Sequence, residues 1–221
     1  MKIAPTFLYQ KIKDIIYPRV CCICECFNEE YICPSCYKKI EKDIKPKLDS
    51  HKDKYFAEHL YIFKYKDWVR REIIKYKFYD AAYLSDLFTK IILKNEKICG
   101  ILEKYDIMIP VPIHKKRKAQ RGYNQSELIA KKVANSLQNI ELATDVLIKI
   151  KNNVPQSSLT KKQRIDNAKG VYKIQKQEKI KDKNIVLFDD IYTTGNTANE
   201  CAKKLIENGA KSVLVFTIAK D

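Results

Sequence analysis

Two adjacent carboxylates, Asp189 and Asp190, are the residues whose types and spacing point most directly to chemistry. They follow the apolar run 185–188, which is short and rich in β-branched and aromatic residues, as in a parallel strand buried on both faces. A helix cap or an ion pair needs only one acid, and two neighbouring acids repel each other. The pair therefore predicts a binding or catalytic site at the end of this strand.

The turn after the two acids consists of small and hydroxyl-bearing residues: Thr193, Thr194, Gly195, Asn196 and Thr197. A helix is predicted directly behind it, over residues 198–207. The first N–H groups of a helix have no partner within the helix, and the helix dipole favours negative charge there. An ordinary strand-to-helix turn with a Thr-rich cap is the alternative. We expect an anionic group, such as a phosphate, to bind here.

A second candidate for anion binding is the stretch 114–125, which is rich in Lys and Arg and contains no acid. It follows another predicted buried strand, 106–112. It precedes a helix predicted over 126–138, with Asn124 or Ser126 as its cap. Open α/β sheets bind ligands beyond the carboxyl ends of their strands. We therefore favour a basic, anion-binding loop over a solvated run of charges.

Two further segments have a composition that fits ligand binding. Residues 153–164 are polar and basic with few apolar anchors, as in a mobile lid over an active site. Residues 55–83 interleave aromatic and basic side chains, which can stack the bases of single-stranded nucleic acid. Rings at strand or helix spacing are usually buried, so we predict a core role for most of them.

The N-terminal part carries two Cys-x-x-Cys pairs, Cys21 with Cys24 and Cys33 with Cys36. Four thiolates at this spacing make a closed tetrahedral zinc site, which is structural because no coordination position is left for a reacting water. Cys22 and Cys26 allow other ligand frames, and disulfides are the alternative to a metal. A reducing compartment disfavours disulfides. The sequence thus predicts a small zinc ribbon with four cysteine ligands.

Composition fits one α/β domain with a small appendage, for which we predict the bounds 54–221 and 1–53. The net charge of +16 over 221 residues implies partners with phosphate or other anionic groups, or an acidic membrane surface. No apolar run is long enough to span a bilayer, and the N-terminus does not resemble a signal peptide. We therefore expect a cytoplasmic location.

Apolar patterning predicts the elements that position these residues. Strands are predicted at 60–65, 106–112, 145–150, 185–188 and 212–218. Helices are predicted at 5–16, 67–77, 81–95, 126–138 and 198–207. A charged turn is predicted over 173–183. This set fits an α/β fold.

The stretch 185–197 resembles the phosphoribosyl pyrophosphate (PRPP) site of the type I phosphoribosyltransferases. That fingerprint is four apolar residues, two acids, an apolar residue, a variable residue and T-T/S-G-x-T, and every position is met. The resemblance implies a core of parallel sheet flanked by helices, with Mg²⁺ accompanying PRPP. It implies that Asp189 and Asp190 hold the ribose hydroxyls at the catalytic centre and that residues 193–197 hold the 5′-phosphate. It implies contacts to pyrophosphate or DNA from Lys115, Arg117, Arg121, Lys161, Lys162 and Arg164.

The whole chain resembles the ComF (ComFC) family of competence-associated, phosphoribosyltransferase-like proteins. The family motif P-V-P-x-H appears at 110–114, R-G-F-N-Q at 121–125 with Tyr123 in place of Phe, and Q-x-x-L-x-x-x-x-R-x-x-N at 156–167. The Cys pairs match the family's N-terminal zinc ribbon.

Membership would imply a protein that binds PRPP with Mg²⁺ and single-stranded DNA and helps to handle or import transforming DNA in natural transformation. Its partners would be the competence helicase or inner-membrane DNA-uptake proteins, and it would associate with the inner-membrane face. The alternative is an active phosphoribosyltransferase that acts on an unidentified acceptor.

Overall fold

The computed structural model describes residues 19–152 and 170–221. The chain packs as two compact units, which divide between Ile44 and Lys45. Sequence patterning put the domain boundary after residue 53, whereas strand β1 (Lys47–Ser50) pairs with β2 (Glu58–Lys64) of the second unit. The helix predicted over 5–16 and the lid predicted over 153–164 lie outside the described residues.

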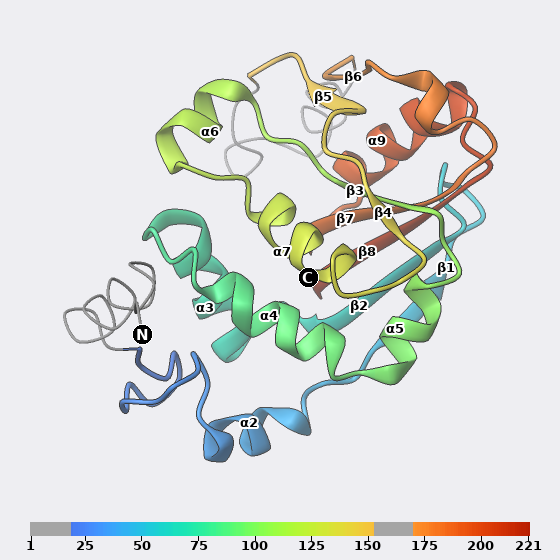
Figure 1. Cartoon of the computed structure of the whole chain (residues 1–221). Coiled ribbons are helices and arrows are strands. Elements are labelled where there is room, and N and C mark those ends of the chain that lie inside the picture. The colour runs from blue at the N-terminus through green and yellow to red at the C-terminus, as the bar shows by residue number, and fades with distance from the viewer. Residues whose placement is uncertain (1–18, 153–169) are drawn as a thin grey trace, which may run out of the picture. The chain divides into compact units, whose positions relative to one another are not determined.

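The second unit is built on a six-stranded sheet with the strand order β1-β2-β8-β7-β3-β4 (Figure 1). Besides β1 and β2, its strands are β3 (Ile107–Pro110), β4 (Glu141–Leu142), β7 (Asn184–Tyr192) and β8 (Ser212–Lys220). Every pairing in this sheet is parallel except that between β1 and β2. The parallel sheet confirms the predicted α/β fold class.

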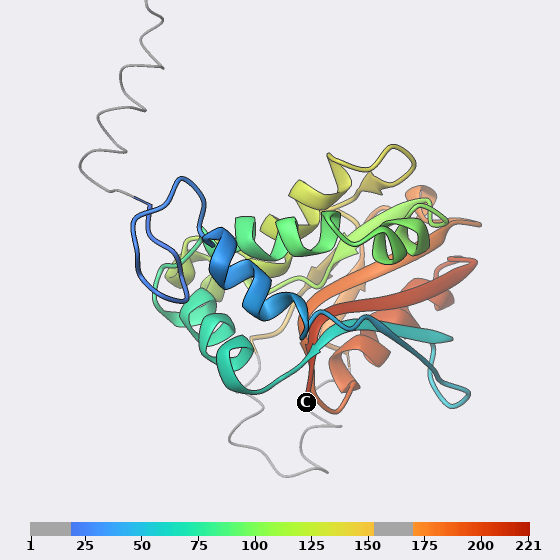
Figure 2. The same cartoon turned by 90° about the horizontal axis from the view of Figure 1, so that it is seen from below.

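Helices cover both faces of the sheet (Figure 2). One face carries α4 (Leu84–Leu93), α5 (Glu96–Leu102) and α7 (Gln125–Ala134), and the other carries α9 (Asn196–Glu207). Because both faces are covered, the central strands are apolar over most of their length, and residues 185–188 are fully buried as predicted.

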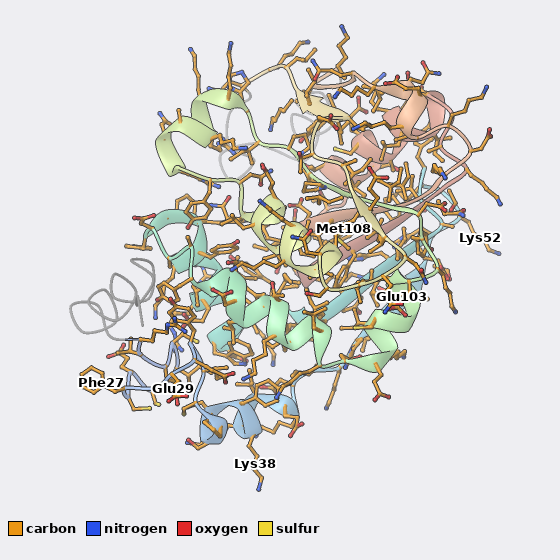
Figure 3. The ribbon with its side chains drawn as sticks, in the orientation of Figure 1. Phe27, Glu29, Lys38, Lys52, Glu103 and Met108 are labelled. Atoms are coloured by element: carbon orange, nitrogen blue, oxygen red, sulfur yellow. The ribbon has the colours of Figure 1, made fainter. Side chains whose placement is uncertain are left out.

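Side chains follow the same division between core and surface. Met108 of β3 is fully buried within the fold, whereas Lys52 and Glu103 point away from the ribbon (Figure 3). In the part of the chain that the structure describes, no helix is both long enough and apolar enough to cross a bilayer.

The basic stretch after β3 was predicted to be a loop, and this is wrong, because most of the stretch forms a helix. This helix, α6 (Lys115–Arg121), begins at His114, whose Nδ1 accepts a hydrogen bond from the backbone N–H of Lys116. It ends at Gly122, which has a left-handed φ of 79°. Lys and Arg are good helix formers, and the cap and the terminal glycine bound the helix at both ends.

Two strand boundaries also differ from the predictions. The charged turn predicted over 173–183 begins with a strand, β6 (Tyr172–Ile174), which pairs with β5 (Leu147–Lys149) in a separate antiparallel sheet. A single 3₁₀ turn, Gln177–Lys179, follows it. Strand β7 continues past the two acids to Tyr192, because its pairing with β8 extends that far.

Most aromatic rings of residues 55–83 pack into the fold, as predicted. Buried rings are those of Phe56, Tyr61, Phe63 and Tyr76, and partly buried rings are those of Tyr65, Trp68 and Tyr83. The three exposed rings are Tyr55, Phe78 and Tyr79. Phe78 is the last residue of α3 (Asp67–Phe78), the helix that follows β2.

Candidate functional site

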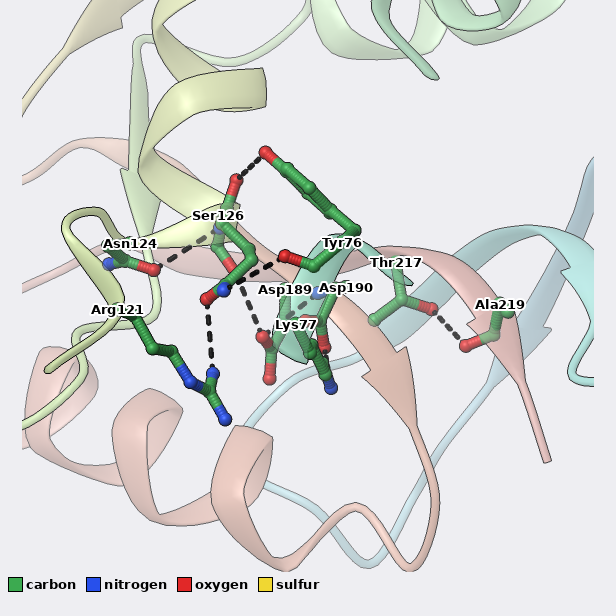
Figure 4. Close-up of polar contacts among 10 residues, drawn as sticks. Tyr76, Lys77, Arg121, Asn124, Ser126, Asp189, Asp190, Thr217 and Ala219 are labelled. Atoms are coloured by element: carbon green, nitrogen blue, oxygen red, sulfur yellow. Dashed lines mark hydrogen bonds and ion pairs between the residues drawn. The ribbon is translucent and has the colours of Figure 1, made fainter. Parts of the chain in front are cut away.

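The two acids lie in the C-terminal part of β7, where each meets a different partner (Figure 4). Asp189 Oδ1 accepts hydrogen bonds from Ser126 Oγ at 3.0 Å and from the backbone N–H of Asp190 at 2.9 Å. Asp190 Oδ1 lies 2.8 Å from Nζ of Lys77. Helix α7 thus supplies a hydroxyl to Asp189, and helix α3 supplies a cation to Asp190. The two neighbouring carboxylates therefore have different partners.

Burial and the adjacent charge of Asp190 raise the pKa of Asp189 to about 7, although Lys77, the Asp190 amide and Ser126 oppose the shift. In the unfolded chain this carboxyl ionises near its ordinary value of 3.8. Between these two values the folded protein holds a proton that the unfolded chain has lost.

We therefore expect Asp189 to lower the stability of the folded state progressively as the pH rises from about 4 to about 7. The Asp189→Asn variant should lose this part of the pH dependence. Urea unfolding of both proteins at several pH values in this window measures it. Parallel stability curves for the two proteins would contradict the raised pKa.

The turn after β7 depends on a glycine. Gly195 has a φ of 73° and caps α9, and a Cβ placed on it would lie 2.2 Å from Tyr192 Oη. The Tyr192 ring cannot easily retreat, because it stacks on the fully buried His59 with ring centroids 4.0 Å apart. Since Gly195 has no side chain, it offers no acceptor to the first backbone N–H groups of α9. These groups are therefore available to bind an anion.

A cleft of about 1210 Å³ opens above the acids, and the turn 193–197 and helix α6 both contribute to its lining. Arg117 and Arg121 of α6 also line it, together with Lys149 of β5. Burial, and then the charge of Arg117, lower the pKa of Lys149. A partly buried cation beside another cation is unfavourable unless an anion joins them. This wall of the cleft is therefore suited to a negatively charged ligand.

Hydrogen bonds between α3 and the turn from α6 to α7 fix the position of Arg121 (Figure 4). Gln125 Nε2 donates to the Tyr76 carbonyl at 3.3 Å, and Tyr76 Oη donates to the Gln125 carbonyl at 2.8 Å. Tyr123 Oη donates to the same Tyr76 carbonyl at 2.8 Å. Arg121 Nη1 donates to Gln125 Oε1 at 3.2 Å. The segment 121–125 thus binds α6 and α7 to the helix that supplies Lys77.

Asn124 joins the same turn to the sheet. Its Oδ1 accepts a hydrogen bond from the backbone N–H of Ser126, so Asn124 caps α7. Its Nδ2 donates to the Val111 carbonyl just beyond β3. One of the two predicted caps, Asn124, is thereby confirmed. The second, Ser126, instead directs its hydroxyl to Asp189.

The structure brings most of the predicted site residues of the described chain into one cleft. The lining includes Arg117, Arg121, Asp189, Asp190, Thr193, Gly195, Asn196 and Thr197. Thr194 is exposed outside the lining, and Lys115 lines a separate cleft of about 450 Å³. Lys161, Lys162 and Arg164 lie outside the described residues.

Sequence reasoning missed Lys77, Ser126, Lys149 and Thr217. The first two contact the acids directly, and Thr217 is the register partner of Asp189 on β8. One local signal existed for Lys149, which is a single cation within an otherwise apolar strand. No local signal marks Lys77 or Ser126, because their partners lie far away in the sequence.

The first unit carries the cysteine cluster. The Sγ atoms of Cys21, Cys24, Cys33 and Cys36 all lie within 4.8 Å of one another, and those of Cys24 and Cys33 are 3.8 Å apart. A tetrahedral zinc ion with Zn–S bonds of about 2.3 Å requires sulfur atoms about 3.8 Å apart, so the four thiols fit this metal. Cys33 also caps α2 (Pro34–Glu41), which presents Cys36 from its first turn.

Two further cysteines lie beside this cluster. Cys26 is exposed, with its Sγ 3.3 Å from that of Cys24, and Cys22 is buried. The predicted frame is the one whose four thiols converge, and no other group of metal-ligating side chains gathers within the described residues.

Comparison with known proteins extends these observations. Residues 124–221 match the phosphoribosyl transferase domain, and this segment contains the acids of β7 and the turn 193–197. Competence protein F of Haemophilus influenzae is 26% identical over 152 residues, which cover 67% of this chain and 66% of that protein. Competence protein ComFC of Bacillus subtilis is 29% identical over 161 residues, which cover 72% of this chain and 62% of that protein.

DNA utilization protein YhgH of Escherichia coli K12 is 27% identical over 140 residues, covering 63% of this chain and 60% of that protein. The matches thus span slightly less than two thirds of these relatives' own length. The domain match and the names of these relatives support a ComFC-family, phosphoribosyltransferase-like protein, whose core has the type I phosphoribosyltransferase fold.

Proposed function

We propose that the protein binds PRPP with Mg²⁺ and single-stranded DNA, and that it helps to handle or import transforming DNA in natural transformation. The observation that carries the first half is the cleft itself. Its floor holds two carboxylates, one side is the glycine-capped start of α9, and the other side presents Arg117 and Arg121. PRPP has the matching sequence of groups: a 5′-phosphate, a ribose with free hydroxyls, and a pyrophosphate.

Each part of the cleft has a role in this proposal. The turn 193–197 binds the 5′-phosphate through its backbone N–H groups and hydroxyls. Asp189 and Asp190 accept hydrogen bonds from the ribose hydroxyls. The arginines and Lys149 neutralise the pyrophosphate, and Mg²⁺ would supply further positive charge to the bound PRPP.

The Asp189→Asn/Asp190→Asn protein is expected to lose at least about tenfold in PRPP affinity, because neutral amide oxygens replace the charged acceptors for the ribose hydroxyls and hydrogen bonds to charged acceptors are stronger. Isothermal titration calorimetry with PRPP and Mg²⁺ measures the change. Asp53→Asn serves as the control, since Asp53 is highly exposed, with its side chain at 76% relative exposure, and does not line the cleft. Absence of binding heat with the unmodified protein would refute PRPP as the ligand.

The net charge of the protein supports the proposal that it binds single-stranded DNA. A net charge of +16 favours a polyanion, and the exposed lysines of α6 extend from the cleft wall. Each phosphate that Lys or Arg neutralises releases a counterion, so affinity for single-stranded DNA should fall steeply with added salt. Fluorescence anisotropy with a labelled oligonucleotide at several salt concentrations tests this. Binding that is absent at low salt would remove DNA from the proposal.

Two further assignments accompany the function. We propose that the four-cysteine cluster of the first unit holds a structural zinc ion. We also propose, from the competence names of its relatives, that the protein works with a DNA helicase or inner-membrane DNA-uptake proteins.

Phosphoribosyl transfer is the second candidate function, and the size of the cleft favours it. Small-molecule sites commonly enclose about 300–1,000 Å³. The cleft of about 1210 Å³ has space for an acceptor beside PRPP. In this reaction the bond from ribose C1 to the pyrophosphate oxygen breaks, and a bond from C1 to the acceptor forms. Pyrophosphate release that depends on a nucleobase or oligonucleotide, and that Asp189→Asn/Asp190→Asn abolishes, would establish it.

A further inference from the structure

The C-terminal end of α3 exposes two consecutive aromatic side chains that have no role in the functions proposed above. Phe78 is 66% exposed and Tyr79 is 72% exposed, more than any other large apolar side chain in the described second unit. The chain then turns at Asp80, which has a left-handed φ of 50°. Two adjacent aromatic rings that are exposed to solvent, one of them in the lining of the cleft, suggest a binding surface.

Phe78 lines the cleft, as do Lys77 and Asp80. The guanidinium carbon of Arg121 lies 5.0 Å from the centroid of the Phe78 ring, and Arg121 is itself held by Gln125. This cation–π contact covers one side of the ring and restrains it. The remaining exposed side is therefore a preorganised surface for another planar group.

Charge identifies the kind of planar group. Arg121 is the last residue of α6, and Lys115, Lys116 and Lys118 of the same helix are exposed. A free nucleobase would make no use of these cations, and an apolar protein segment would desolvate them. Single-stranded DNA supplies both bases that stack on aromatic rings and phosphates that bind lysines.

We propose that Phe78 is a stacking platform for a base of single-stranded DNA, whose adjoining phosphates lie along α6. This inference rests on the DNA-binding half of the proposed function and specifies its location. It predicts a contribution to affinity that requires a base and an open ring face, and that salt does not screen. The same DNA would then approach the mouth of the cleft that holds the two acids.

The test compares the unmodified protein, Phe78→Ala, Phe78→Trp and the control Tyr55→Ala on two oligonucleotides. One is an oligothymidine, and the other has the same length and charge but abasic residues. Tyr55 is another exposed ring, and it does not line the cleft. Fluorescence anisotropy at several salt concentrations gives the affinity and its salt dependence.

Phe78→Ala is expected to weaken oligothymidine binding by about fivefold or more, the lower end of base–aromatic stacking, without changing the salt dependence. It should leave abasic DNA binding unchanged, while Phe78→Trp and Tyr55→Ala should retain full affinity for both. If the unmodified protein binds oligothymidine and abasic DNA equally, or if Phe78→Ala loses affinity equally for both, the platform is refuted while DNA binding itself stands. If the unmodified protein binds neither, both this inference and the DNA-binding proposal fail.

Discussion

Replacing Gly195 with alanine is expected to lower the free energy of unfolding by about 1–3 kcal/mol and to weaken PRPP binding by at least about tenfold. A residue with a Cβ is strained at a φ of 73°, and here the added carbon would lie 2.2 Å from Tyr192 Oη. Relief requires a shift of the turn, because Tyr192 is buried and stacked on His59. Urea unfolding and calorimetry with PRPP and Mg²⁺ measure the two effects.

Gly100→Ala is the matched control for this change. Gly100 lies inside α5, and a Cβ on it would meet no atom within 4 Å. Alanine in a helix interior is favoured over glycine by about 0.5–1 kcal/mol, so this variant should be slightly more stable and should bind PRPP normally. A Gly195→Ala protein that is as stable as the unmodified protein would show that the turn tolerates a side chain.

Removing zinc is expected to unfold the N-terminal unit and to leave the unfolding of the second unit unchanged. The unit is small, so the free energy of metal binding to its four converging thiols is expected to be a large part of its folding free energy. Limited proteolysis should reveal cleavage sites before Ile44 that appear only after chelation. Elemental analysis should find one zinc ion per chain in the purified protein.

Single cysteine substitutions identify which thiols bind the metal. Cys24→Ser should lose most of the zinc, whereas Cys26→Ser should keep it, although the two sulfur atoms are only 3.3 Å apart. The opposite result would assign the site to a different cysteine frame. A stable folded N-terminal unit without any metal would exclude a structural ion altogether.

Local patterns predicted those parts of the fold and site that depend on neighbouring residues. The run 185–188, the acids after it and the turn around Gly195 are contiguous, so their types alone indicate strand, site and helix start. The two Cys-x-x-Cys pairs are equally local. These elements were predictable because burial on both faces and helix capping leave direct marks on the sequence.

Contacts between distant segments were not predictable in this way. Lys77 pairs with Asp190, and Ser126 binds Asp189, only because α3 and α7 meet the end of β7. The helical form of α6 was missed because a run of lysines and arginines has no apolar stripe from which to recognise a helix. Strand β6 was missed because it is three residues long and depends on pairing with β5.

The strand order has a consequence for the synthesis of the protein. The two strands at the centre of the sheet, β7 and β8, are synthesised after β1, β2, β3 and β4, yet β8 separates β2 from β7, and β7 separates β8 from β3. Until then, β1 with β2 and β3 with β4 can form only two separate pairs of strands. The apolar edges of these pairs remain exposed and can bind chaperones. Lys77 and Ser126 likewise have no carboxylates to meet until then. The nascent chain acquires its ligand site only once β7 and β8 have been synthesised and have completed the sheet.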